Sequence, residues 1–186
     1  MNAMSFLVST LFDIYIMVVI LRIWLQAARA DFYNPFSQFI VKATQPVVGP
    51  LRRLIPSIGS VDLATILFAY VLCVVKFFAL IFIASNGSSA SFNAYFLFLG
   101  LLSLIKAAGG LLFWVLLIRA ILSWVSQGRS PIEYVFHQLT EPMLAPIRRI
   151  IPVMGGFDLS VLVLFIVLQF ANFLMGDIIG PLWYQL

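Results

Sequence analysis

Four long apolar runs constrain the fold of this chain more than any other feature. A helix needs about 20 apolar residues to cross the roughly 30 Å hydrocarbon core of a bilayer, and each run is that long. The runs are continuous and do not alternate, so they predict transmembrane helices; only helices or closed barrels satisfy their backbone groups in lipid. They cover about residues 4–28, 63–84, 92–125 and 159–179.

The composition excludes a soluble globule. Of the 186 residues, 63% are hydrophobic and only 10% are charged, whereas about 25% are charged in an ordinary soluble domain. A chain of this length cannot bury so much apolar surface, because small domains leave a large fraction of their residues at the surface. We therefore expect an all-α integral membrane protein.

The distribution of basic residues predicts the orientation in the membrane. Seven Lys and Arg residues lie in the loops 29–61 and 126–157, and none lies in the polar loop 85–91. Basic loops stay in the cytoplasm. We therefore expect both basic loops to be cytoplasmic and both termini and the polar loop to be external. No basic region precedes the first apolar run, so we expect no cleavable signal peptide.

The two basic loops are copies of one sequence. Residues 44–62 recur 96 positions later as 140–158, and nine of the nineteen positions are identical. Each copy lies between two spans, so both copies have the same orientation, as in a parallel tandem repeat. The expected organisation is repeat 1 at 1–84, the external loop at 85–91 and repeat 2 at 92–186.

Each basic loop begins with a helix start, in which an N-cap residue precedes a proline, as in Asn34-Pro35 and Ser130-Pro131. Apolar residues then recur at helical spacing, which predicts an amphipathic helix lying in the membrane interface. We expect Pro46 and Pro142 to end these helices, because a proline inside a helix loses a hydrogen bond. The apolar positions are Phe36, Phe39, Ile40 and Ala43 in one copy and Ile132, Val135, Phe136 and Leu139 in the other.

The third apolar run is too long for a single untilted span. As one straight helix, residues 92–125 would measure about 50 Å. The run must tilt, bend or begin as an interfacial segment. Gly109-Gly110 is the expected position of a bend or break.

Each repeat carries a pair of adjacent arginines, Arg52-Arg53 and Arg148-Arg149, within a frame of prolines. Two guanidinium groups can bind the phosphate of an anionic lipid or a partner protein. The alternative is a topological anchor that touches headgroups without specificity, and this alternative is favoured because juxtamembrane arginines are common for topology alone.

Charged residues inside the spans occur at matched depths. Asp13 and Lys76 both lie about 21 Å from the cytoplasmic end, and Lys106 and Asp177 both lie about 28 Å from it. We favour charge pairs that hold the bundle together over a polar pathway for an ion or proton, because few hydroxyls and amides line the spans.

Four further charged residues lie near the cytoplasmic ends of the spans. Asp62 and Asp158 precede the second and fourth spans, where a carboxylate caps the positive end of a helix. Arg22 and Arg119 are equivalent in the two repeats and are expected to extend toward these carboxylates.

The sequence argues against an enzyme. It contains one cysteine, Cys73, and one histidine, His137. No nucleophile–base pair, metal-ligand set or phosphate loop is recognisable. We expect no catalytic residue, no metal, no cofactor and no nucleic-acid partner.

The duplicated pattern T-x-P-x3-P-x-R-R-x2-P-x2-G-x2-D, with R-x4-W at Arg119–Trp124, resembles the YggT family, called YlmG in other lineages. The resemblance covers nearly the whole chain. It implies a bacterial inner-membrane protein linked to osmotic-shock tolerance and ion homeostasis, with relatives linked to cell division and, in plastids, to cytochrome assembly and nucleoid organisation.

Two functions follow as hypotheses. The first is a non-enzymatic membrane protein that supports osmotic or ion homeostasis as a small channel-like oligomer. The second is an assembly or scaffold factor whose cytoplasmic hairpins dock anionic lipid or an unidentified membrane or cytoplasmic protein. Gly176-x3-Gly180 is a weak indication of helix association in a homo-oligomer.

The predicted orientation can be tested by cysteine accessibility. A cysteine at position 88 should react with an impermeant thiol reagent added outside the cell, whereas cysteines at positions 52 and 148 should be protected. Protection at position 88 combined with external labelling at 52 and 148 would reverse the proposed topology.

Overall fold

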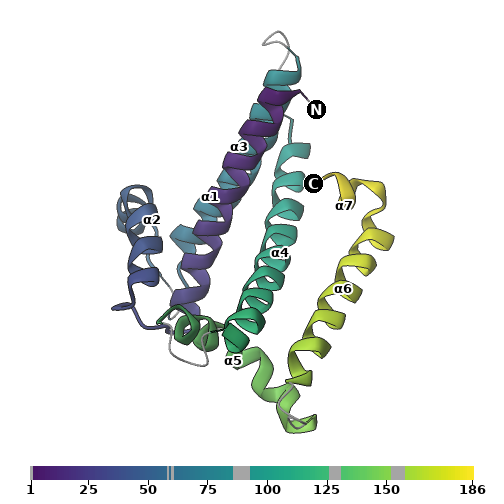
Figure 1. Ribbon diagram of the computed structural model, residues 1–186. Coiled ribbons are helices and arrows are strands. Elements are labelled where there is room, and N and C mark those ends of the chain that lie inside the picture. Colours follow the sequence, from purple (N-terminus) through teal and green to yellow (C-terminus); the bar gives the residue numbers. More distant parts are fainter. Residues whose placement is uncertain (1, 58, 60, 86–92, 126–130, 152–157) are drawn as a thin grey trace. The chain divides into compact units, whose positions relative to one another are not determined.

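The computed structural model describes residues 2–57, 59, 61–85, 93–125, 131–151 and 158–186, and within them the chain is all-helical. The all-α class predicted from the sequence is confirmed. The helices, labelled in Figure 1, are α1 (Ala3–Ala27), α2 (Pro35–Leu54), α3 (Leu63–Ala84), α4 (Tyr95–Val125), α5 (Pro131–Ile150), α6 (Leu159–Ile179) and α7 (Pro181–Gln185).

Four of these helices, α1, α3, α4 and α6, are long and apolar enough to cross a membrane. The predicted bounds of the second and fourth spans agree with α3 and α6, and α1 differs from the first predicted span by one residue at each end. The third predicted span begins at residue 92, which lies outside the described residues. Helix α4 itself begins at Tyr95, whose backbone N–H donates to Asn93 Oδ1 over 3.1 Å.

The predicted break at Gly109-Gly110 is wrong, because α4 continues through both glycines as one helix. A glycine costs about 1 kcal/mol in a helix interior relative to alanine. Opening the backbone inside a bilayer would leave polar groups unsatisfied at several kcal/mol each. A continuous helix is therefore lower in free energy than a helix broken at these glycines.

The amphipathic helices do not end at Pro46 and Pro142, contrary to the sequence-based prediction. Helix α2 contains Pro46 and Pro50, and α5 contains Pro142 and Pro146. All four prolines lie on the exposed side of their helix. A carbonyl freed by a proline on that side can bind water, so the lost backbone hydrogen bond does not end the helix.

The apolar faces of these two helices pack largely inside the protein, whereas the sequence analysis expected these faces to lie on the membrane interface; the position of the helices at the interface stays a prediction. Ile40, Val135, Phe136 and Leu139 are buried, and Thr44 and Thr140 lie on the same buried faces. Only Phe39, Ala43 and Ile132 of the predicted apolar positions are exposed. The helices are therefore anchored by protein packing, and a different exposed surface remains for other contacts.

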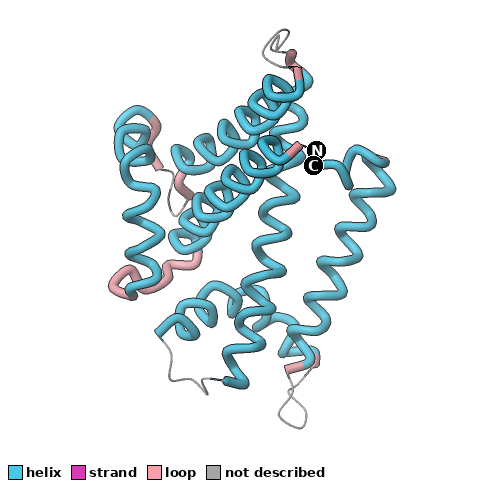
Figure 2. Tube along the Cα trace, turned by 45° about the horizontal axis from the view of Figure 1, so that its top comes forward, coloured by secondary structure: helices cyan, strands magenta, loops and turns pink. Residues whose placement is uncertain are grey.

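The chain divides into two compact units, and each is described by itself. Unit 1 comprises residues 1–23, 40–108 and 186. In it α1 and α3 run antiparallel and side by side (Figures 1 and 2). The rings of Tyr15 and Phe68 meet edge to face, with centroids 6.1 Å apart. Gly100 of α4 lies against Val74 of α3, where an added side chain would clash with the Val74 side chain and press closely on the Val74 backbone.

Unit 2 comprises residues 24–39 and 109–185. Leu116, Leu144 and Leu164 form its buried cluster, with one residue from each of α4, α5 and α6. The start of α2 also belongs to this unit. There Asn34 Nδ2 donates to the Pro131 carbonyl over 2.7 Å, and the ring of Phe36 lies 5.6 Å from that of Phe136.

Unit 2 ends in a hook that the sequence analysis did not predict. Gly180 takes a positive φ of 77° and reverses the chain after α6, a conformation that favours glycine. The Tyr184 ring of α7 lies against Gly176, and the buried Trp183 donates its Nε1–H to Asn172 Oδ1 over 2.9 Å. Both glycines therefore serve a contact within this unit, whereas the sequence suggested a contact with another copy.

Candidate functional site

The candidate site lies where the amphipathic helices meet the ends of the spans. In unit 1, Arg22 near the end of α1 extends to α2 and is buried. Its Nη1 donates to Thr44 Oγ1 over 2.6 Å and to the Val41 carbonyl over 3.2 Å. Its Nη2 donates to Gln45 Oε1 over 2.8 Å. These contacts fasten α2 to the end of α1.

Unit 2 repeats the arrangement with Arg119 of α4, which is also buried. Arg119 donates through Nη1 to Thr140 Oγ1 and through Nη2 to Glu141 Oε2, the latter over 3.4 Å. The two predicted arginines thus bind the neighbouring amphipathic helix, whereas the sequence predicted that they extend to Asp62 and Asp158. The difference arises because α2 and α5 stay helical and present a threonine to each arginine.

Thr44 and Thr140 are site residues that sequence reasoning missed. Each hydroxyl donates to the carbonyl four residues earlier, at Ile40 and Phe136, over 2.8 Å in both cases. The oxygen is then left as an acceptor for the arginine. Both threonines are fully buried. Their identity at the first position of the repeated motif was the available signal.

The carboxylates of Asp62 and Asp158 lie at the predicted cap positions. Asp62 Oδ1 accepts from the Thr65 backbone N–H over 3.3 Å at the start of α3. Asp158 Oδ1 accepts from the Ser160 backbone N–H over 3.1 Å at the start of α6. Each carboxylate has a second role, which is to bind an arginine.

Arg52 binds Asp62, and Arg148 binds Asp158; we call these the Arg–Asp pairs. Arg52 Nε donates to Asp62 Oδ2 over 2.8 Å, and its Nη2 donates to the same oxygen. Arg148 repeats both contacts, with Nε 3.1 Å from Asp158 Oδ2. Each pair links the end of an amphipathic helix to the start of the next span.

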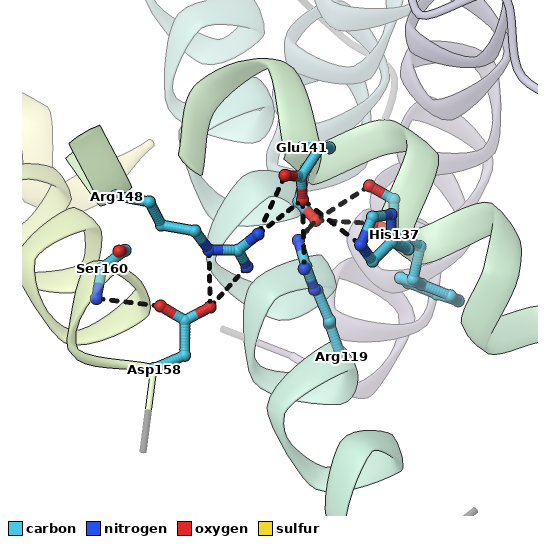
Figure 3. Close-up of polar contacts among 8 residues, drawn as sticks. Arg119, His137, Glu141, Arg148, Asp158 and Ser160 are labelled. Atoms are coloured by element: carbon cyan, nitrogen blue, oxygen red, sulfur yellow. Dashed lines mark hydrogen bonds and ion pairs between the residues drawn. The ribbon is translucent and has the colours of Figure 1, made fainter. Parts of the chain in front are cut away.

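In unit 2 a further carboxylate joins the cluster, as Figure 3 shows. Arg148 Nη1 donates to both oxygens of Glu141, over 2.8 and 2.9 Å. Arg119 and His137 Nε2 each approach Glu141 Oε2 to 3.4 Å. Glu141 therefore bridges α4 and two parts of α5. Unit 1 has Gln45 at the equivalent position, which carries no charge.

The electrostatics of the Arg–Asp pairs favour the charged forms. Burial raises the pKa of the Asp62 carboxyl, but the hydrogen bonds from Arg52 and Thr65 outweigh it, so the pKa lies below its ordinary value. Burial also raises the pKa of the Asp158 carboxyl, but the hydrogen bonds from Arg148 and Ser160 outweigh it, so this pKa is lowered as well. The Asp158 hydrogen bond raises the pKa of Arg148.

The second arginine of each pair is exposed. Arg53 and Arg149 have no polar partner among the described residues. Each is followed by a large exposed apolar side chain: Leu54 is 80% exposed and Ile150 is 82% exposed. We call Arg53-Leu54 and Arg149-Ile150 the helix tips. Only one arginine of each predicted pair is therefore available to an external ligand.

Within the spans, the structure brings together Asp13 of α1 and Lys76 of α3. Lys76 Nζ donates to Asp13 Oδ1 over 2.7 Å. Ser9 Oγ donates to the other carboxylate oxygen over 3.2 Å. The lysine side chain is 7% exposed and the aspartate side chain 43%.

The other predicted intramembrane pair is placed differently. Lys106 Nζ donates to the Leu186 oxygen over 3.1 Å. Asp177 is exposed on α6. Lys106 belongs to unit 1 and Asp177 to unit 2, so contact between them stays a prediction.

Comparison with known proteins identifies relatives across the full length. The sequence model of the CCB3/YggT family matches residues 1–83 and 98–179. An uncharacterised Vibrio alginolyticus protein, described by its position in the proC 3′ region, is 87% identical over 186 residues, all of both chains. The Escherichia coli K12 protein YggT is 50% identical over 179 residues, covering 96% of this chain and 92% of that one. No solved structure matches the chain.

The Arg–Asp pair of unit 1 should contribute to stability, and this can be measured by thermal unfolding of the full chain in detergent micelles. Arg52→Ala leaves the Asp62 carboxylate, which is only 1% exposed, without its counter-charge. We expect a loss of at most about 3 kcal/mol, because Arg52 itself is partly exposed. The matched control is Arg53→Ala, which should change stability by less than about 0.5 kcal/mol. Equal effects of the two substitutions would contradict the pairing.

The same pair predicts a pH dependence with a defined sign. The folded-state pKa of Asp62 lies below the ordinary value of 3.8, so its contribution is present above that pH and is lost as the pH falls through the lowered pKa. In Arg52→Ala the pKa of Asp62 is no longer held down by Arg52. The acid-induced loss of stability attributable to Asp62 should therefore be smaller than in the unmodified chain, measured as unfolding temperature against pH.

A double-mutant cycle tests the Asp13–Lys76 contact. Asp13→Ala or Lys76→Ala alone leaves an uncompensated charge in the membrane, which costs at least about 2.5 kcal/mol on insertion scales, so folded yield should fall. The double replacement should recover the yield. Asp177→Ala is the control, because it removes an exposed span carboxylate from the other unit. Additive single and double effects would show that the two side chains do not interact.

Proposed function

Because the chain belongs to the CCB3/YggT family of membrane proteins, we propose that it is a non-enzymatic, multi-pass protein of the bacterial inner membrane that docks anionic lipid phosphates at its two helix tips. It would act there as an assembly or scaffold factor on the cytoplasmic side. The observation that carries the proposal is the repeated helix tip, an exposed arginine followed by an exposed Leu or Ile at the end of both α2 and α5.

The chemistry of a helix tip matches the membrane interface. An arginine guanidinium binds a phosphate through two parallel hydrogen bonds. The neighbouring apolar side chain gains free energy by entering the acyl boundary just below the headgroups. A tip directed at a protein surface would also be compatible with the arginine, but a lone aliphatic side chain beside it favours lipid.

The Arg–Asp pairs support the same function from within the fold. They hold the first arginine of each pair against the start of the next span, and the second arginine lies beside it at the exposed end of the helix. Lys42 of α2 is also exposed and adds to the positive potential of the same helix. Anionic lipids attract each such charge by about 1 kcal/mol near the surface at low salt.

Lipid titration tests the docking proposal. The full chain in detergent is titrated with short-chain phosphatidylglycerol, and bound lipid is counted by native mass spectrometry. Replacing Arg53 and Arg149 together by Gln should weaken binding at each tip by about fivefold at low salt, at about 1 kcal/mol per charge, whereas either replacement alone should weaken binding at one tip only. Phosphatidylcholine is the lipid control, and Lys42→Gln is the matched single-charge variant, for which a smaller effect is expected.

The outcomes of the titration separate lipid from protein docking. Unchanged phosphatidylglycerol affinity in the double variant would overturn lipid docking at the tips. Equal affinity of the unmodified chain for phosphatidylcholine would overturn it as well. Loss of cellular function in a double variant that keeps full lipid affinity would instead assign the tips to a cytoplasmic or membrane partner.

Support of ion homeostasis and osmotic-shock tolerance is the second candidate function. The observation in its favour is the charged pair Asp13–Lys76 inside the spans, since intramembrane charges commonly mark ion or proton pathways. Ion flux measured with the purified chain in proteoliposomes tests it. Absence of flux for K⁺, Na⁺, Cl⁻ and protons would overturn a channel-like role.

A further inference from the structure

A line of polar side chains in unit 1 connects one end of the spans with Asp13. Asn2, Ser5, Ser9 and Asp13 are spaced three or four residues apart and therefore lie on one face of the α1 segment. Ser5 Oγ donates to Asn2 Oδ1 over 2.9 Å, and Ser9 Oγ donates to Asp13 Oδ2 over 3.2 Å. The line ends at the ion pair with Lys76.

The ion pair lies near the middle of the two apolar helices. Counted from the ends of α1 and α3 that lie together (Figure 1), Asp13 is about 15 Å deep and Lys76 about 12 Å deep. The hydrocarbon core is about 30 Å thick. Both charges are therefore close to its midplane, where a charge facing lipid would be costly.

The accessibility of Asp13 is unusual for its position. It lies on the buried face of α1, where Ser5 is 7% exposed and Ile16 is 1% exposed. The Asp13 side chain is nevertheless 43% exposed. The described residues supply two hydrogen-bond donors to this carboxylate, Ser9 and Lys76, although an ionised carboxylate can accept about four. Water is the partner that fits the remaining acceptor positions.

The second copy of the repeat lacks this arrangement. With Arg22 aligned to Arg119, the positions of Asn2, Ser5, Ser9 and Asp13 correspond to Leu99, Leu102, Lys106 and Gly110. With residues 44–62 aligned to 140–158, Lys76 corresponds to Asn172, which instead accepts a hydrogen bond from Trp183. The Asp13–Lys76 pair is therefore not part of the frame that the two copies share.

We propose that Asp13, with Ser9 and Lys76, forms a hydrated proton-binding site that is loaded from the end of unit 1 at which Asn2 lies. The proposal deepens the second candidate function and is independent of lipid docking. A proton fits better than a metal ion, because the Lys76 ammonium already occupies the cation position at the carboxylate.

Proton binding has a defined structural consequence. A proton from water adds to a free lone pair of Asp13 and converts the carboxylate to a neutral acid. Lys76, which is only 7% exposed, then loses its counter-charge, and the attraction between α1 and α3 weakens. Two other ionisable groups lie within electrostatic range of the ion pair. Cys73 of α3 interacts electrostatically with Asp13, and Lys106 of α4 interacts electrostatically with Lys76. Lys106 in turn contacts the Leu186 oxygen.

Infrared difference spectroscopy tests the site directly. The full chain is reconstituted in phosphatidylcholine vesicles, which carry no net surface charge, and spectra at neutral and acidic pH are subtracted. We expect a carbonyl band of a protonated carboxylic acid that is lost in Asp13→Asn and retained in Asp177→Asn, the control in the other unit. An identical band in Asp13→Asn would overturn the proposal.

A second variant keeps the test decisive if Asp13→Asn does not fold. Ser9→Ala preserves the ion pair and removes one hydrogen bond to the ionised carboxylate. The carbonyl band of the protonated acid should change in frequency, because Asp13 no longer has the Ser9 hydroxyl as a hydrogen-bond partner. A band identical to that of the unmodified chain would overturn the assignment. A protonation band without ion flux would keep the site and exclude transport, so the failure of the two proposals can be distinguished.

Discussion

A carboxylate held away from solvent at the start of a helix needs a counter-charge within the protein, and the Arg–Asp pairs supply it where each amphipathic helix meets the next span. Asp62 and Asp158 cap their helices and at the same time neutralise Arg52 and Arg148. The cap fixes the start of a span, and the ion pair fixes the end of the preceding helix. The position of the exposed helix tips depends on both contacts.

The two copies of the repeat share this frame but differ in what surrounds it. Glu141 and His137 make the cluster of unit 2 a network of acidic and basic groups, whereas unit 1 has Gln45 and Val41 at these positions. Conversely, unit 1 alone carries the Asp13–Lys76 pair inside its spans. The two copies therefore share the contacts that join each amphipathic helix to the next span and differ in the charged groups around them.

Much of the fold follows from the sequence, because apolar length and helix-start residues are local properties. The bounds of α3 and α6 and the starts of α2 and α5 at Pro35 and Pro131 are of this kind. The path of α2 and α5 through their prolines was not predictable by the same rule, because it depends on which face is exposed after packing. The role of Thr44 and Thr140 depends on tertiary contact with Arg22 and Arg119, although their identity in both copies pointed to it.

The paired prolines of α2 have a mechanical consequence. Pro46 and Pro50 are one helical turn apart, so two neighbouring backbone hydrogen bonds are missing from the same side of the helix. Bending stiffness is therefore lower in one direction than in the others. Arg22 holds the first part of α2 at Thr44. The part of α2 that bends most easily therefore lies between Thr44 and the C-terminal end of the helix. Helix α5 has the same directional compliance at Pro142 and Pro146, so lateral forces at the membrane surface would deflect both helices about hinges at the same place in their sequence.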